Sequence, residues 1–236
     1  MTENHVQSAD TVSSPRRHAA GEDPRKREQI LAGAWQEFMA KGFDAATMNG
    51  ICRAAGVSKG TLYVYFRNKE DLFVALVEHR RDQITEQLRA ALAIPGGIEA
   101  RLIAYAAAMI RMQTSPDVLR AQRIVVAMAE RMPELARRFY DAGARQVIGG
   151  LVRWLTDAQE AGHLHIPNAE RAAHQFIELA MAGVWRQCLF GVRREEPDQA
   201  EIDGLAADAV RIFMAAHHAP TSDMAPVPDQ KGSPPR

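Results

Sequence analysis

The 236-residue sequence predicts an all-α fold of two unequal parts, and three observations support this. Beyond Pro95-Gly96-Gly97, apolar residues recur at helical spacing and no stretch shows the alternation of a half-buried strand. Between Thr47 and Lys69, two short helices with clear cap residues follow one another. From Leu72 to Leu92, an apolar face repeats over a stretch long enough for one helix that links the two parts.

The first helix is predicted over residues 24–41, and Gly42 provides its end. One face of this helix carries apolar side chains four residues apart: Ile30, Ala34 and Phe38. Trp35 lies beside that stripe. We therefore expect Trp35 to be a core residue that supports the next two helices, and not part of a ligand site.

Residues 47–69 have the pattern of two helices joined by a tight turn. Thr47 and Ser58 each precede a short helical pattern, and their hydroxyls can accept hydrogen bonds from the free N–H groups of a first helical turn. Gly56 follows the first pattern and can adopt the left-handed conformation that ends a helix. Asn68 is expected to cap the long helix that runs to about Ala93.

The second of these helices has two different faces. Leu62 and Phe66 point inward, whereas the opposite side carries small, hydroxylated and aromatic residues: Gly60, Thr61, Tyr63 and Val64. Residues 47–69 also contain four cations, Arg53, Lys59, Arg67 and Lys69, and no acidic residue, although the whole chain has a net charge of zero. A helix of this kind fits the major groove of DNA between phosphate walls. The alternative is a plain helical hairpin with a solvated basic face.

The residues 56–66 (GVSKGTLYVYF), followed by 68–72 (NKEDL), resemble the signature of TetR-type transcriptional repressors. The resemblance covers residues 24 to about 84. It implies a three-helix DNA-binding domain on an all-helical regulatory domain. It also implies a homodimer that leaves its DNA operator when a small ligand binds.

The resemblance also implies residue roles. Phosphate contacts fall to Thr47, Ser58, Lys59, Tyr63, Tyr65 and Lys69. Base contacts fall to Asn49, to Thr61 and to the backbone of Gly60, and Tyr63 can serve either role. The sequence departs from the usual pattern at Asn49-Gly50, and Gly50 is expected to cost its helix about 1 kcal/mol relative to alanine.

The predicted domains are a disordered tail (1–23), the helix-turn-helix domain (24–84), a helical regulatory and dimerisation domain (85–218) and a second tail (219–236). The regulatory helices are expected near 98–113, 116–130, 133–161, 168–190 and 198–217. Residues 111–140 are similar to the regulatory domain of AefR-like members of the same family.

Large soft side chains in the regulatory half suggest a pocket for a lipophilic ligand, because methionine and aromatic residues line adaptable cavities. The candidates are Tyr105, Met109, Met112, Trp154 and Phe176. Each of them taken singly is also a plausible core residue.

The last two predicted helices are the candidate dimer interface, since the family pairs its final helices into a four-helix bundle. The candidates are Phe176, Leu179, Gly183, Val184, Phe190, Leu205, Ala209, Ile212 and Phe213. Burial within one subunit is the alternative.

The sequence thus predicts a cytoplasmic, homodimeric repressor that binds a near-palindromic double-stranded DNA operator and is released by a small ligand. The alternatives are a TetR-type activator and a constitutive regulator without ligand. No catalytic motif, metal-ligand set, cofactor site, membrane span or signal peptide is evident. Cys52 and Cys188 lie far apart and are expected to be reduced thiols, with a redox sensor as the alternative. His163 and His165 are expected to be solvated turn residues without a metal.

Overall fold

The computed structural model describes residues 23–218, and the predictions for residues 1–22 and 219–236 lie outside this range. The all-α prediction is confirmed, since the described residues form eleven helices and no strand. The helices are α1 (Pro24–Ala45), α2 (Met48–Ala55), α3 (Lys59–Tyr65), α4 (Lys69–Leu92), α5 (Ile98–Thr114), α6 (Pro116–Met128), α7 (Pro133–Ala142), α8 (Ala144–Glu160), α9 (Ala169–Ala180), α10 (Val184–Leu189) and α11 (Gln199–His217).

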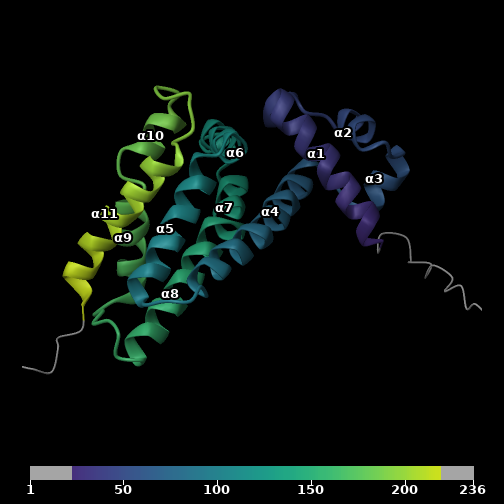
Figure 1. Ribbon diagram of the computed structural model, residues 1–236. Helices are drawn as coiled ribbons and strands as arrows, with labels where there is room; N and C mark the ends of the chain where they lie inside the picture. The colour runs from purple at the N-terminus through teal and green to yellow at the C-terminus, as the bar shows by residue number, and fades with distance from the viewer. Residues whose placement is uncertain (1–22, 219–236) are drawn as a thin grey trace, which may run out of the picture.

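Helices α1, α2 and α3 form a small unit, the head, at one end of the molecule (Figure 1). Its core contains three phenylalanine rings in mutual contact, with centroids 5.7 Å apart for Phe38–Phe43, 5.2 Å for Phe38–Phe73 and 5.4 Å for Phe43–Phe73. Phe73 belongs to α4, so the first turns of α4 complete the head.

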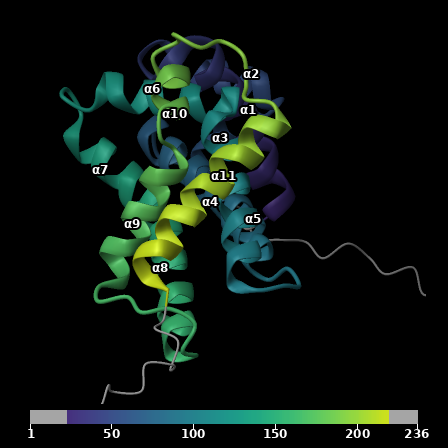
Figure 2. The same cartoon turned by 60° about the vertical axis from the view of Figure 1, so that its left-hand side comes forward.

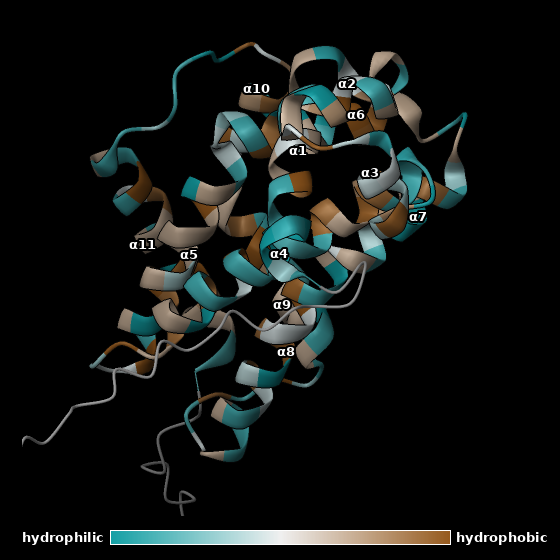
Figure 3. Cartoon of the chain, turned by 90° about the vertical axis from the view of Figure 1, so that its right-hand side faces the viewer, coloured by the Kyte–Doolittle hydropathy of each residue, from teal (hydrophilic) through white to brown (hydrophobic). Residues whose placement is uncertain are grey.

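The other helices form a larger unit, the body, around α5. This helix contacts α4, α9, α10 and α11, and Leu102, Ala106 and Ile110 on it are completely buried. Helices α9 and α11 make the outer layer of the body on the side away from the head (Figures 1 and 2). Seen from the head side, hydrophilic and hydrophobic residues alternate around the helices, as expected for helices that each bury one face (Figure 3).

Helix α4 is shared by the two units. Its 24 residues correspond to a length of about 36 Å at 1.5 Å per residue. Leu72 and Leu76 lie in the core of the head, whereas Leu88 and Leu92 lie in the core of the body. The predicted domain boundary at residue 84 falls within this helix.

Helices α6 and α7 also connect the body to the head. Met128 and Leu135 are buried in the same apolar cluster as the phenylalanines of the head. Two arginines add polar contacts from the same side: Arg120 donates to the Met39 carbonyl oxygen at 2.7 Å, and Arg138 donates to the Asp71 carboxylate at 3.2 Å.

Two long helices that the sequence predicts are each divided in two. The predicted helix 133–161 breaks at Gly143, whose φ of −107° and ψ of −91° are not helical. There Arg81 donates to the Ala142 carbonyl oxygen at 2.9 Å, so this tertiary contact satisfies the end of α7. The predicted helix 168–190 breaks before Gly183, whose φ of 83° lies in the region that favours glycine.

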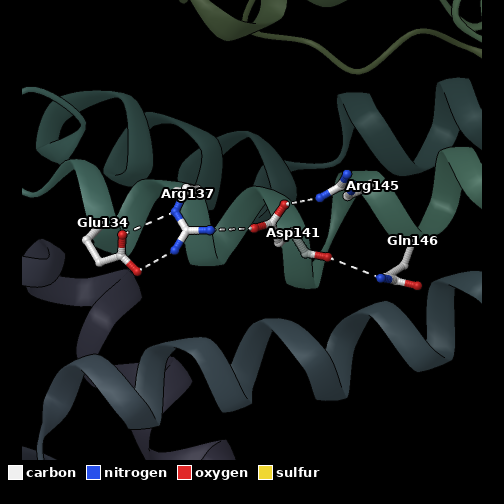
Figure 4. A network of polar contacts seen from close by, with 5 residues as sticks. All are labelled: Glu134, Arg137, Asp141, Arg145 and Gln146. Carbon is white, nitrogen blue, oxygen red and sulfur yellow. Dashed lines mark hydrogen bonds and ion pairs between the residues drawn. The ribbon is translucent and has the colours of Figure 1, made fainter.

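An ion-pair network runs along α7 and crosses the break to α8 (Figure 4). Arg137 bonds Glu134 at 2.7 Å and Asp141 at 3.4 Å, and Arg145 of α8 bonds Asp141 at 3.1 Å. Most of these side chains are exposed, so we expect each pair to add only a few tenths of a kcal/mol. Within this network, the pair between Arg145 and Asp141 is the one that joins α8 to α7.

None of the described helices combines the length and the apolar composition that a bilayer-spanning segment requires.

Candidate nucleic-acid interface

Helices α1 and α2 approach each other closely where both carry glycine. A Cβ atom at Gly33 would lie 2.4 Å from the backbone nitrogen of Ala55. A Cβ atom at Gly50 would lie 1.9 Å from Oε1 of Glu37. The departure from the family pattern at Gly50 therefore has a structural reason, because a buried carboxylate occupies the space of the missing side chain.

Glu37 is the buried carboxylate beneath α2, and the sequence interpretation missed it. Its Oε1 lies 2.7 Å from Nζ of Lys41, and only 7% of the residue is exposed. The hydrogen bond from Lys41 holds the pKa of the Glu37 carboxyl below its ordinary value of 4.5, assisted by the charge of Lys41 and the Thr47 N–H, while burial opposes the shift. The signal in the sequence was the unusual glycine at position 50.

We expect Glu37→Gln to destabilise the head by about 1 kcal/mol at pH 7, because the charged form of Glu37 is the one that Lys41 stabilises. Since the folded pKa is lowered, this stability is present above pH 4.5 and is lost as the pH falls through the folded pKa. Urea unfolding of both proteins from pH 3 to 8 tests this. A difference that stays constant across the pH range would contradict it.

The cap residues of the helix-turn-helix are confirmed. Thr47 Oγ1 accepts from the Gly50 N–H at 3.0 Å, and Ser58 Oγ accepts from the Thr61 N–H at 3.0 Å. Gly56 has φ 61° and ψ 37°, which is the left-handed conformation. The Ser58 cap therefore fixes the start of α3, and the conformation of Gly56 fixes the turn before it.

Helix α3 presents the predicted surface. Leu62 is completely buried, whereas Tyr63 is 47% and Val64 is 53% exposed. Lys59 and Gly60 are also exposed. A Cβ atom at Gly60 would meet only Ser58 Oγ, at 3.8 Å, so the fold itself does not require glycine at this position.

The nine predicted DNA contacts fall into two groups. Thr47, Asn49, Ser58, Lys59, Gly60, Thr61 and Tyr63 lie on α2, α3 and their caps, and six of them are exposed while Thr61 is half-buried. Tyr65 and Lys69 instead contact the two ends of α1. The Tyr65 hydroxyl donates to the Asp23 carbonyl oxygen at 3.3 Å. Lys69 Nζ donates to the carbonyl oxygens of Phe43 at 2.9 Å and Asp44 at 3.2 Å.

A cavity of about 670 Å³ lies between the head and the body. Helices α4, α5, α6 and α8 form most of its wall, and α1, α7 and α9 contribute one residue each. The apolar lining includes Phe73, Leu76, Val77, Ile84, Met109, Met112, Phe139, Val147, Ile148 and Ile177. This volume and lining fit a small-molecule site.

The predicted pocket residues are placed differently. Met109 and Met112 line the cavity as expected. Tyr105 and Phe176 do not, because both are buried in the body core with their ring centroids 6.2 Å apart. Trp154 packs against the same core and is also absent from the lining. Trp35 packs against the core of the head as expected, but it is only half-buried and also lines the cavity, which was not expected.

The predicted dimer residues fall into two groups, one buried within the chain and one at the surface. Phe176, Val184 and Ala209 are at most 5% exposed, so their side chains are buried within the chain. Phe213 is 2% exposed and lies at the floor of the groove between α9 and α11. Leu205 is half-buried against the body core. Leu179, Gly183 and Ile212 line a shallow groove between α9 and α11, and Phe190 is 79% exposed.

The cysteines and histidines form no further site in residues 23–218, where no group of three potential metal ligands occurs. His163 and His165 are exposed. Cys52 and Cys188 are both free thiols, Cys52 being half-buried and Cys188 buried. Burial raises the pKa of the Cys188 thiol, which makes it a poor nucleophile.

Comparison with known proteins identifies the two units. The family model for the C-terminal domain of AefR-like transcriptional repressors matches residues 100–219, and that for bacterial regulatory proteins of the tetR family matches residues 30–76. The HTH-type transcriptional repressor Rv1474c of Mycobacterium tuberculosis is 33% identical over 134 residues, which cover 54% of this chain and 70% of that protein. The chain spans about a third of the length of two other bacterial regulators that it matches.

Solved structures show the same architecture. A Mesorhizobium loti protein described as a TetR-family transcriptional regulator superposes with a TM-score of 0.76 at 24% identity, covering 84% of this chain and 98% of that one. The flavonoid-responsive regulator FrrA gives a TM-score of 0.68 at 30% identity, covering 84% and 99%. The chain therefore belongs to the TetR family of bacterial transcriptional regulators, which bind DNA and are not enzymes.

Proposed function

We propose that this protein is a homodimeric repressor that holds an operator through α3 and leaves it when a small apolar ligand enters the cavity. The observation that carries the proposal is the exposed face of α3, which has small, hydroxylated and cationic residues on a helix whose own fold leaves that face open. The matching family of AefR-like repressors supports repression in place of activation.

The contacts with DNA follow from the placement of the side chains. Lys59, Thr47 and Ser58 are exposed at helix starts, where they suit phosphate oxygens. Gly60, Thr61 and Asn49 suit base edges. Tyr65 contributes mainly by holding the start of α1 against α3, and Lys69 by holding the end of α1 against α4, since their polar atoms already contact carbonyl groups there.

The ligand acts by preferring one position of the head over another. The cavity wall contains residues of α4 and α6, and both helices also pack into the head. A ligand shifts the equilibrium only through different affinities for the two positions. FrrA is named for its response to flavonoids, and a small-molecule effector of that size also fits this cavity.

The test of the proposal is a gel-shift experiment with DNA from upstream of the protein's own coding region, repeated at several salt concentrations. We expect competitor-resistant binding, and we expect Lys59→Ala to lower the salt slope by about one ion. Thr61→Ala is expected to change sequence preference instead. Equal weak binding to all DNA sequences would contradict an operator at this site, and an unchanged slope for Lys59→Ala would contradict the phosphate contact.

The dimer is proposed to form through the groove between α9 and α11. We expect Ile212→Asp to convert the dimer to a monomer, because a carboxylate would replace an apolar side chain that is 46% exposed beside Leu179. Sedimentation velocity measures the change. Val126→Asp is the matched control, since Val126 is 67% exposed on α6, away from this groove. A dimeric Ile212→Asp protein would rule out this interface.

A further inference from the structure

We propose that the effector is a weak acid with an apolar body, and that its carboxylate binds Arg80. This inference rests on the proposed role of the cavity as an effector site, and it assigns the chemical class of the ligand and the residue that selects it. Arg80 lies on α4 and lines the cavity together with the apolar residues named above.

The charges in the wall of the cavity favour an anion. Three arginines line it, Arg80, Arg81 and Arg111, against a single acidic residue, Asp117. The charge of Arg81 is paired with Asp82, so Arg80 and Arg111 provide the excess. An apolar cavity with excess positive charge at its edge suits a molecule with an apolar body and a negative end.

Arg80 differs from the other two arginines because its donors are unused. Arg81 donates to the Asp82 carboxylate at 2.6 and 2.9 Å and to the Ala142 carbonyl oxygen at 2.9 Å. Arg111 donates to Oε1 of Gln199 at 2.9 and 3.3 Å. Arg80 donates no hydrogen bond within the part of the chain that the structure describes, because its ion pair with Asp117, at 3.7 Å, is too long for one.

A carboxylate would use those donors. A guanidinium group can bind a carboxylate through two parallel hydrogen bonds, which are shorter and stronger than the long ion pair it would replace. The Arg80 side chain is 42% exposed, so it can move toward the ligand without unpacking the core.

The movement of Arg80 toward a ligand would also transmit ligand binding to the head. The Arg80 guanidinium carbon lies 4.3 Å from the ring centroid of Trp35, and Trp35 belongs to α1. Asp117 lies in the first turn of α6. Arg80 therefore links α1, α4 and α6, and an acid that draws it away weakens its contacts with both neighbours.

The test compares decanoate with decan-1-ol, which have the same apolar chain and differ in charge. Binding is measured by calorimetry and by tryptophan fluorescence, and release from the operator by gel shift. We expect decanoate to bind and to release DNA more effectively than decan-1-ol. Arg80→Met should weaken decanoate binding about tenfold or more and leave decan-1-ol binding within about twofold.

Three further variants sharpen the result. Asp117→Asn should tighten decanoate binding by about threefold, because it removes the carboxylate that competes for Arg80. Arg89→Met is the matched control, since Arg89 is on the same helix, pairs with Glu86 and does not line the cavity. Trp35→Phe should remove most of the fluorescence change caused by decanoate.

The outcomes separate this inference from the proposed function. Equal binding of both probes, or an equal loss of both in Arg80→Met, would overturn the assignment of an acid while leaving the cavity as an effector site. Binding of neither probe, with DNA binding unaffected, would overturn the apolar effector site itself and this inference with it.

Discussion

Replacing Gly33 with alanine is expected to destabilise the protein by about 2–3 kcal/mol. The added Cβ would lie 2.4 Å from the backbone nitrogen of Ala55 and 2.6 Å from its Cα. Because these are backbone atoms of α2, no side-chain rotation relieves the contact, and α1 and α2 must move apart. This cost exceeds the gain of about 1 kcal/mol that alanine brings to a helix interior.

Thermal and urea unfolding would measure this loss, and operator affinity should fall with it because α2 positions α3. Gly204→Ala is the matched control, since Gly204 lies inside α11 and a Cβ atom there would meet no other atom within 4 Å. We expect that control to stabilise the protein slightly. A stable Gly33→Ala protein with normal DNA binding would show that the two helices are not as close as described.

Replacing Gly60 with leucine is expected to abolish specific DNA binding while leaving the fold intact. The space around the Gly60 Cβ position is open, so leucine meets no obstacle in the protein and improves the helix propensity of α3. In the complex, the same side chain would hold the helix away from the base edges. Since base contacts contribute about 1–3 kcal/mol each, losing two or more reduces operator affinity at least about thirtyfold.

This interpretation requires that the substitution lowers DNA affinity without lowering thermal stability. The melting temperature of Gly60→Leu should equal or exceed that of the parent protein, while gel shifts should show only sequence-independent binding. Ala90→Leu provides the control, because Ala90 is exposed on α4 outside the head and the cavity. Full operator affinity in Gly60→Leu would mean that α3 does not lie in the groove as proposed.

Much of the head could be predicted from its sequence, because local chemistry controls it. The caps Thr47, Ser58 and Asn68 lie next to the N–H groups that they bond, and Gly56 ends α2 through its own backbone conformation. Periodicity likewise identified Leu62 as buried and the opposite face of α3 as exposed.

The distribution of roles in the body could not be predicted in the same way. Periodicity shows which helix face is apolar but not what that face meets, so Tyr105 and Phe176 were expected beside a ligand and lie in a closed core instead. Phe213 was expected at a partner subunit and packs against Phe176, with ring centroids 5.0 Å apart. Both placements have one cause, which is that an apolar side chain is buried equally well by its own chain, a ligand or a second subunit.

Neighbouring residues along the chain therefore determine the helical fold class, the helix caps, the turn between α2 and α3, and the polar face of α3. The reason is that hydrogen bonds within a few residues fix these features. Three other features depend on residues far apart in sequence: the break at Gly143, the buried Glu37 beneath Gly50, and the placement of Trp35 against Arg80. Each of these arises where two helices cross, and the crossing depends on the shapes of both surfaces together. A one-dimensional pattern of apolar residues contains no information about that geometry.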